Sequence, residues 1–220
     1  MNDEVILREV GPRDGLQMIK SQLITDIKLE WIKAQAKTGF TEIEVTSYVP
    51  ASVLPQFADA GRVLSGAQKI GGLLPTVLVP NLRGAVMAMD AGAKKITFVL
   101  SVSESHNMAN VRQSTKASLA MLRDVVAIRE SRRDTKIATA LATSFGCSIE
   151  GPVSEARVNE IVESVAEAGV DEINLADTVG YGDPKQVKRI FTDVKRTVGS
   201  LPIAAHFHAT RGLGLANVVA

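Results

Sequence analysis

Three stretches of the chain repeat the same order of local signals, and this repeat limits the possible folds more than any other feature. The segments KTGFTEIEV, DAGAKKITFV and EAGVDEINL each run from the end of a helical pattern through a glycine into a strand-like run. Glycine supplies the left-handed backbone that ends a helix and lets the chain turn back. Because each helix returns the chain to the same edge of the sheet, such units predict parallel strands.

Seven strand-like runs and six helical patterns alternate along the sequence. Strands are expected at 5–10, 41–46, 73–80, 94–100, 136–143, 171–177 and 203–208. Helices are expected at 26–39, 56–67, 82–92, 111–132, 154–169 and 184–199, with a loop at 107–114 running into the fourth of them. The last residues, GLGLANVVA, look like the start of a seventh helix. Repeated βα units form an open, doubly wound sheet or a closed barrel. The number of units, without a Gly-rich dinucleotide fingerprint, favours a single α/β domain over 1–220: a (β/α)8 TIM barrel whose eighth βα unit is absent from this chain.

Composition argues against several kinds of partner. The net charge is +1, so nothing favours nucleic acid or a membrane surface. No apolar run approaches the roughly 20 residues that a membrane span needs. The single cysteine, Cys147, fits a reducing compartment and is expected to be a small buried apolar residue. The N-terminal segment has acidic residues and only a short apolar run, unlike a signal peptide, so a cytoplasmic protein is expected.

Polar residues follow the predicted strands, and in a barrel the chemistry sits where strands end and loops begin. The candidate site residues are Arg13, Asp14 and Gln17 after the first strand, Glu44 on the second, Ser103 and Asn107 after the fourth, Asp177 and Thr178 at the end of the sixth, and His206 and His208 on the seventh. Lys94 and Lys95, at the start of the fourth strand, are expected to be solvated.

The motif HFH is the sharpest local signal. Residues two apart on a strand point to the same face, so His206 and His208 are expected side by side. Two adjacent imidazoles suit a divalent metal, although HxH alone also fits a pair of half-buried, hydrogen-bonded histidines. Asp14 would complete a two-histidine, one-carboxylate set with open positions. The alternative for Arg13 and Asp14 is a solvent-exposed ion pair in a surface turn.

Five segments together resemble the hydroxymethylglutaryl-CoA lyase family, within the DRE-TIM metallolyase superfamily. They are EVGPRDGLQ, IEVTSYVP, FGCSIEG, LADTVGYGDP and HFHATRG, in the family's order along essentially the whole chain. Related aldolases and synthases share only the RDG core of GPRDGLQ. The resemblance implies a (β/α)8 barrel and a metal-dependent retro-Claisen cleavage, whose natural substrate gives acetyl-CoA and acetoacetate.

The resemblance also implies roles for the matching positions. Asp14, His206 and His208 correspond to the ligands of a divalent ion, Mg or Mn. Arg13 corresponds to the arginine that neutralises oxyanion charge on substrate and enolate. The predicted catalytic residues are Arg13, Glu44 and Asp177, and the predicted substrate-binding residues are Arg13, Gln17, Ser103, Asn107 and Thr178. The expected partner is a small-molecule acyl-CoA, and a homo-oligomer is expected.

The chain also departs from the family pattern. After the second histidine it reads ATRGL where the family has DTYGQ, so Ala209 replaces an acid that could orient a ligand imidazole. The family's asparagine ligand and its reactive-cysteine loop have no counterpart among these 220 residues. Two alternatives therefore stay open: a Claisen-type synthase or aldolase of the same superfamily, and a non-catalytic barrel that binds an acyl-CoA.

Overall fold

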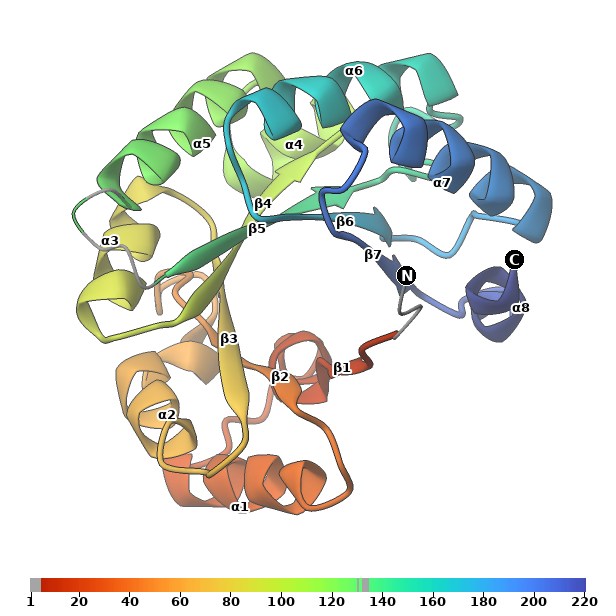
Figure 1. The fold of residues 1–220 in the computed structure, drawn as a ribbon. Helices are drawn as coiled ribbons and strands as arrows, with labels where there is room; N and C mark the ends of the chain where they lie inside the picture. The colour runs from red at the N-terminus through yellow and green to blue at the C-terminus, as the bar shows by residue number, and fades with distance from the viewer. Residues whose placement is uncertain (1–4, 130, 132–134) are drawn as a thin grey trace. The chain divides into compact units, whose positions relative to one another are not determined.

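The computed structural model describes residues 5–129, 131 and 135–220, in which strands and helices alternate (Figure 1). The strands are β1 (Arg8–Glu9), β2 (Glu42–Ser47), β3 (Leu74–Val79), β4 (Lys95–Ser101), β5 (Lys136–Ala142), β6 (Glu172–Asp177) and β7 (Ile203–Phe207). The helices are α1 (Thr25–Ala36), α2 (Ala60–Ala67), α3 (Leu82–Asp90), α4 (Glu104–Val111), α5 (Thr115–Arg129), α6 (Glu155–Glu167), α7 (Pro184–Val198) and α8 (Gly214–Val219), with a π-helical turn η1 (Gly11–Gly15) and a 3-10 turn η2 (Pro55–Phe57).

The strands keep in the sheet the order that they have in the sequence, with β1 and β7 at the two ends of that order. β1 pairs with β2 and β2 with β3, while β5 pairs with β6 and β6 with β7, each time in parallel. Parallel neighbours need a crossover connection, and the intervening helices supply it. The helix–glycine–strand repeat of the sequence is therefore the repeat of the fold.

The chain divides into two compact units, which are described separately. The first contains Met1–Thr97 and Ser131–Lys136, and the second contains Phe98–Glu130 and Ile137–Ala220. The division falls within β4, whose first three residues belong to the first unit.

In the first unit, α1 and α2 pack against each other and against β2 (Figure 1). Their apolar side chains meet in a core where Ile32, Ile43, Val63, Leu64 and Val77 have no exposed surface. Burying a side chain of this size contributes about 1.5–3 kcal/mol each, which fixes the helices on the strands. The core therefore holds the carboxyl ends of β1 and β2 in place.

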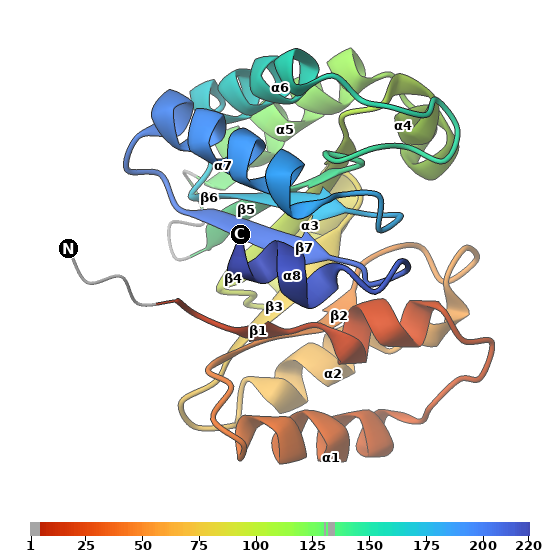
Figure 2. The same ribbon diagram turned by 90° about the vertical axis from the view of Figure 1, so that its right-hand side faces the viewer.

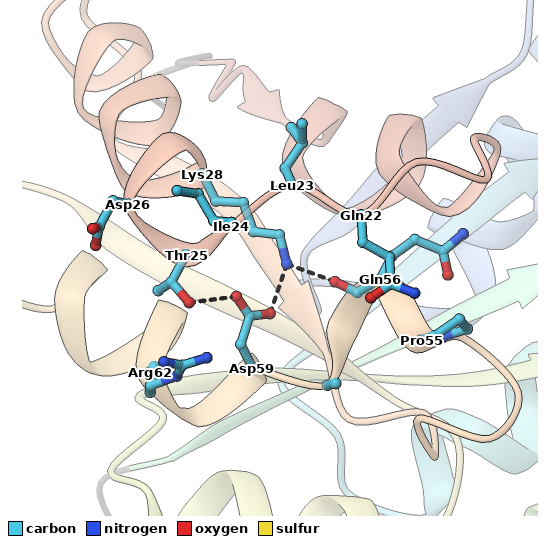
Figure 3. A pocket seen from close by; sticks show the side chains of 11 residues that line it. Gln22, Leu23, Ile24, Thr25, Asp26, Lys28, Pro55, Gln56, Asp59 and Arg62 are labelled. Atoms are coloured by element: carbon cyan, nitrogen blue, oxygen red, sulfur yellow. Dashed lines mark hydrogen bonds and ion pairs between the residues drawn. The ribbon is translucent and has the colours of Figure 1, made fainter.

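A pocket of the first unit lies where α1 begins, beside η2 and α2 (Figure 3). The Lys28 ammonium, 3% exposed, donates to the Gln56 carbonyl and to Asp59 Oδ1, both at 2.6 Å. Thr25 Oγ1 donates to Asp59 Oδ2 at 2.7 Å. These bonds cross-link α1 to the segment before α2, because a buried charge is stable only when it is paired.

In the second unit, α6 packs on α7, and α8 lies beside β7 (Figure 2). Val158 and Val162 of α6 and Leu175 of β6 are fully buried. Phe207 of β7 joins an aromatic cluster, with ring centres 5.5 Å from Phe145 and 6.4 Å from Phe191. The strand alternation then turns the neighbours of Phe207, two histidines, to the opposite face.

Two elements differ from the sequence prediction. The first strand was expected over 5–10, but β1 holds only Arg8–Glu9, and Val5 is 81% exposed. The physical reason is register: β2 begins at Glu42, which lies opposite Arg8, so earlier residues have no strand partner on β2. The second difference is the loop expected at 107–114, where the first part of the segment instead belongs to α4, Glu104–Val111.

Helix α4 has a local cause that the sequence prediction overlooked. Ser103 caps its first turn, because Ser103 Oγ accepts from the His106 N–H at 3.1 Å. Arg112 then adopts a left-handed conformation with φ 58°, which ends α4 before α5 begins at Thr115. The helix predicted from residue 111 therefore begins only at Thr115, after α4 and a short left-handed break.

The burial of Cys147 and the exposure of Lys94 follow the sequence prediction, whereas the burial of Lys95 does not. Cys147 has no exposed surface, as expected, and Lys94 is exposed. Lys95 is instead 5% exposed, and its ammonium lies 2.8 Å from Glu42 Oε1, to which Arg8 Nε also pairs at 2.6 Å. This buried carboxylate offsets the cost of burying the lysine. Within the described residues, no helix has the length and apolar character needed to cross a bilayer.

Candidate active site

The GPRDGLQ segment forms one π-helical turn directly after β1. Arg13 N–H and Asp14 N–H both donate to the Val10 carbonyl, at 3.0 and 2.7 Å. Gly11 has little room for a side chain, since its N–H donates to Glu9 Oε1 at 2.6 Å and a Cβ would lie 2.7 Å from that oxygen. The turn therefore projects the Arg13 and Asp14 side chains from a fixed backbone at the end of β1.

Four predicted site residues of the first unit form one hydrogen-bonded network. Arg13 Nε donates to Glu44 Oε2 at 2.5 Å, and Arg13 Nη1 donates to Asp14 Oδ1 at 3.0 Å. Gln17 bridges the same pair, accepting from Arg13 Nη1 at 3.3 Å and donating to Asp14 Oδ1 at 2.9 Å. Arg13 is 9% and Glu44 3% exposed, so the solvent-exposed ion pair considered from the sequence is wrong. A buried guanidinium between two carboxylates is a preorganised cation.

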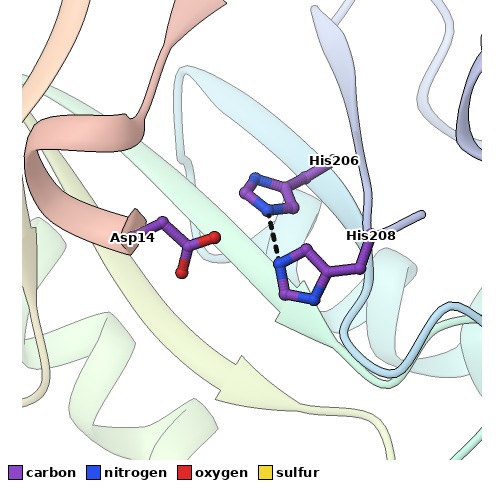
Figure 4. Close-up of side chains that lie close together, drawn as sticks. All are labelled: Asp14, His206 and His208. Atoms are coloured by element: carbon purple, nitrogen blue, oxygen red, sulfur yellow. Dashed lines mark hydrogen bonds between the residues drawn. The ribbon is translucent and has the colours of Figure 1, made fainter. Parts of the chain in front are cut away.

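The two histidines of the second unit lie side by side (Figure 4). His206 Nε2 and His208 Nε2 are 3.0 Å apart, with ring centres 4.9 Å apart, so the two side chains share one face of the strand as the HFH motif predicted. Both imidazoles are half-buried. Phe207, the residue between the two histidines in the sequence, points to the opposite face of the strand and packs against Phe145.

The Thr178 carbonyl fixes the tautomer of His208. His208 Nδ1 lies 2.7 Å from that oxygen, and a carbonyl can only accept, so Nδ1 carries the proton. In the neutral ring, Nε2 then holds a lone pair, which is the form that a metal ligand needs. The β6–β7 register, which pairs Ala176 with His206, sets Thr178 beside His208.

The spacing of the two imidazoles fits a divalent ion. Two ligands about 2.1 Å from an octahedral ion and 90° apart are about 3.0 Å from each other. That is the separation of the two Nε2 atoms. The alternative from the sequence, a simple hydrogen bond, would require a proton on the Nε2 atom of His206. The donor chemistry of the pair therefore suits a metal centre.

Hydroxyl groups tie together the loops that follow β4, β5 and β6. Ser103 N–H donates to Thr143 Oγ1 at 3.2 Å, and Thr143 N–H donates to Thr178 Oγ1 at 2.8 Å. Thr143 adopts φ 60°, which is unfavourable for a β-branched residue. Strained backbone of this kind persists where surrounding contacts over-determine it, and it clusters at functional sites. Thr178 thus holds His208 with its carbonyl while its hydroxyl is anchored to the preceding loop.

Three other predicted site residues use their polar atoms within the protein. Asp177 is fully buried, and its oxygens accept from Tyr181 N–H at 2.8 Å and Gly182 N–H at 2.9 Å. Asn107 Oδ1 accepts from Ser101 N–H at 2.8 Å, and its amide group donates to a backbone carbonyl and a serine hydroxyl. Ser103 Oγ donates to Cys147 Sγ at 3.1 Å in addition to capping α4. These side chains hold the segments that follow β4, β5 and β6.

His106 is a further polar residue of the second unit, and its imidazole lies 2.7 Å from Ser101 Oγ. Burial lowers the pKa of His106 below its ordinary value, and the Glu150 carboxylate acts in the opposite direction. The N–H of Ser105, bonded at 2.6 Å, holds the pKa of Glu150 below its usual range. At neutral pH these shifts leave a neutral imidazole close to a carboxylate.

Sequence reasoning missed the roles of two groups in the second unit. The Thr178 carbonyl has no signal in the sequence, because every residue carries one. Arg211, which lies in the ATRGL departure from the family pattern, was assigned no role, yet its guanidinium donates to carbonyls of the loop after β6. The polarity of LADTVGYGDP suggested a site, but the bonding partners depend on how β6 and β7 pair.

Comparisons with known proteins place these observations in a family. A family model described as HMGL-like matches residues 4–220. The chain is 37% identical over 216 residues to a hydroxymethylglutaryl-CoA lyase of Bacillus subtilis, covering 98% of this chain and 72% of that protein. It is 37% identical over 213 residues to the cytoplasmic 3-hydroxy-3-methylglutaryl-CoA lyase of Homo sapiens, covering 96% of this chain and 57% of that protein.

Solved structures give the same result. An HMG-CoA lyase from Acinetobacter baumannii, in complex with coenzyme A and 3-methylmalate, matches with a TM-score of 0.92 and 38% identity, covering 97% of this chain and 70% of that one. This match confirms the predicted fold class, an α/β fold of the (β/α)8 TIM-barrel type, of which the described residues form seven strands. The motif resemblance is confirmed as well: the chain belongs to the HMGL-like family, whose matched relatives are carbon–carbon lyases.

Proposed function

We propose that this chain carries the catalytic residues of a divalent-metal-dependent carbon–carbon lyase. Its substrate would be a 3-hydroxy-3-methylglutaryl-CoA-like thioester, cleaved to acetyl-CoA and acetoacetate. The observation that carries the proposal is the His206–His208 pair, with Nε2 atoms 3.0 Å apart and the Nδ1 atom of His208 bonded to a carbonyl. The family match supports the reaction class, and the relative in complex with coenzyme A supports an acyl-CoA substrate.

The proposed metal ligands are Asp14, His206 and His208, the three side chains drawn in Figure 4. Two imidazoles and one carboxylate leave coordination positions open for substrate or water. A divalent ion, Mg or Mn, would supply Lewis-acid polarisation of the C3 hydroxyl oxygen. Asp14 is prepared for this role because Gln17 and Arg13 both donate to its Oδ1.

Arg13 is the proposed electrostatic catalyst. Cleavage of the C2–C3 bond moves an electron pair onto the thioester, the C3 hydroxyl loses its proton as its carbon becomes a ketone, and C2 gains a proton to give acetyl-CoA. Negative charge therefore develops on the enolate oxygen in the transition state, where a fixed donor acts most strongly. Glu44 holds the Arg13 side chain through Nε, so the remaining N–H groups face a fixed direction.

The other predicted residues are proposed to act on the loops and the substrate. Asp177 and Glu44, predicted as catalytic, bond to loop amides and to Arg13, which supports positioning roles. Gln17 and Thr178 remain proposed substrate contacts. Ser103 and Asn107 have the least support, because they are 2% and 0% exposed and their side chains bond to neighbouring protein groups. A cytoplasmic location and a homo-oligomer stay predictions.

A specific observation favours one alternative, the non-catalytic acyl-CoA-binding barrel. Ala209 offers no acid to the neighbouring histidines, which the resemblance led us to expect. The Thr178 carbonyl supplies an acceptor for His208 in this chain, which weakens that objection. We therefore propose the lyase function in preference to the non-catalytic barrel.

The full natural chain should be assayed with 3-hydroxy-3-methylglutaryl-CoA and Mg²⁺ or Mn²⁺, following acetoacetate and acetyl-CoA. The reverse mixture, acetyl-CoA with acetoacetate, should be run in parallel. Metal-dependent cleavage supports the lyase, whereas net condensation in place of cleavage points to a synthase. Tight acyl-CoA binding with neither reaction, over a panel of 3-hydroxyacyl-CoA thioesters, would establish the non-catalytic barrel.

A further inference from the structure

Arg211 donates hydrogen bonds to the loop after β6. The lyase motif has a tyrosine at this position. Arg211 Nε donates to the Gly180 carbonyl at 3.0 Å, and Nη2 donates to the Tyr181 and Gly182 carbonyls at 2.5 and 3.4 Å. The guanidinium carbon also lies 5.9 Å from the centre of the Tyr181 ring. One planar cation therefore binds three consecutive carbonyls, which a lysine's single ammonium cannot reproduce in the same geometry.

The same loop is held from its amide side by Asp177. The two carboxylate oxygens accept from Tyr181 N–H and Gly182 N–H, while Arg211 donates to the Gly180 and Tyr181 carbonyls of the same two peptide groups. Each of these peptide groups therefore has an anion at its N–H and a cation at its carbonyl. Asn217 of α8 also donates a hydrogen bond to this loop, at the Gly182 carbonyl and at 3.1 Å. Charge-assisted hydrogen bonds to both the N–H groups and the carbonyls of this loop stabilise a single backbone conformation.

This loop packs against the backbone that carries His208. Gly180 has φ +70°, and a Cβ there would lie 2.8 Å from Thr210 Oγ1 and 2.9 Å from the His208 carbonyl oxygen. The loop begins with Thr178, whose carbonyl binds His208 Nδ1 at 2.7 Å. A shift of the loop would therefore move the acceptor that sets the His208 tautomer.

We propose that Arg211 is a positioning residue for His208. By clamping residues 180–182, it keeps the Thr178 carbonyl in place, so that the imidazole presents the Nε2 lone pair. In this chain the clamp and the carbonyl do what an acid at the position of Ala209 would do by direct contact. The effect on metal binding rests on the proposed function, but the effect on the His208 tautomer does not.

The test compares the full natural chain with its Arg211→Ala and Arg211→Lys variants. Long-range ¹H–¹⁵N spectra of the metal-free protein, at alkaline pH, report which ring nitrogen of His208 carries the proton. The parent should show Nδ1–H, and Arg211→Ala should show a mixture of both tautomers. Mn²⁺ affinity, measured by electron paramagnetic resonance, should weaken about tenfold. This is the low end for removing such support, because Arg211 is exposed.

Arg189→Ala is the matched control, since this exposed arginine pairs with Glu155 on the helices of the same unit. It should change neither readout. Arg211→Lys should fall between parent and alanine, and it decides the question if Arg211→Ala does not fold. An Arg211 variant that keeps the Nδ1–H tautomer and Mn²⁺ affinity within twofold of the parent would overturn the proposal. A parent that binds no Mn²⁺ but shows the tautomer change would count against the proposed function alone.

Discussion

The two units of this chain hold their candidate site residues by different means. In the first unit, Arg13, Asp14, Gln17 and Glu44 hold one another through side-chain bonds of 2.5–3.3 Å. In the second unit, His208 is held by a main-chain carbonyl. Side-chain networks make each member depend on the charge of the others, whereas a backbone acceptor depends only on the path of the chain.

This difference predicts how each group of site residues responds to a substitution. Removing Arg13 would leave Glu44, 3% exposed, without its cation, and an uncompensated buried charge is costly. Removing His208 leaves the Thr178 carbonyl without this donor, and a water molecule can replace it at small cost. We therefore expect substitutions in the first unit to change activity and stability together, and those of the histidines to change metal binding and activity with little change in stability.

The largest effect is expected for His208→Ala. The variant should lose Mn²⁺ binding at this site while its free energy of unfolding stays close to that of the parent, because the ring is half-buried and not part of the apolar core. Isothermal titration with Mn²⁺ and urea unfolding measure the two quantities. His106→Gln is the matched control, since His106 is the remaining histidine and lies outside the pair. If His208→Ala holds Mn²⁺ as the parent does, the ligand assignment is wrong.

Arg13→Met should show the opposite pattern, with activity and stability both affected. Loss of one donor to a developing oxyanion lowers kcat by about 10²–10³, with a smaller change in KM. Leaving Glu44 unpaired should also lower the free energy of unfolding by about 3–5 kcal/mol. Steady-state kinetics and urea unfolding, with Arg13→Lys as the charge-retaining control, separate the two effects. A near-parental kcat would remove Arg13 from the mechanism.

Asp177→Asn tests whether the second unit depends on backbone contacts. An asparagine amide turns a donor toward the Tyr181 or Gly182 N–H, so one buried donor loses its acceptor, at a cost of about 1–3 kcal/mol. Hydrogen exchange of those two amides should become faster. Asp183→Asn is the control, because Asp183 caps α7 by accepting from Gln186 N–H and asparagine caps equally well. Unchanged exchange in Asp177→Asn would show that the loop does not need this carboxylate.

The smallest expected effect is a pH dependence confined to the second unit, which contains all three histidines. The pKa of His106 is lowered by burial, so below about pH 6.5 the unfolded chain binds the proton more readily than the folded one. This contribution to stability is complete above that pH and is lost as pH falls toward the lowered pKa. In the His106→Gln variant, the free energy of unfolding measured in urea should decrease less steeply as the pH falls. A decline as steep as the parent's would assign it to other groups.

Several features of the fold could be read from the sequence, for reasons that are local. The glycine stops and strand-like runs predicted the βα alternation, and six of the seven strands lie within about two residues of their expected positions. The HFH spacing predicted two imidazoles on one face, because strand alternation is a property of the backbone. Other features depended on register or on distant partners, which no local pattern encodes. Lys95 is buried because Glu42 pairs with it, and β1 is short because β2 begins at Glu42.

The sequence by itself determined the class of fold, the family motifs and the chemical types of the candidate site residues. Only the tertiary structure decided how those residues are held. It showed that Arg13 is buried between carboxylates, that the Thr178 carbonyl selects the His208 tautomer, and that Arg211 clamps the loop beside it. The physical reason is that a side chain's type is written at one position, whereas its hydrogen-bond partner is chosen by the pairing of strands and loops far apart in the chain.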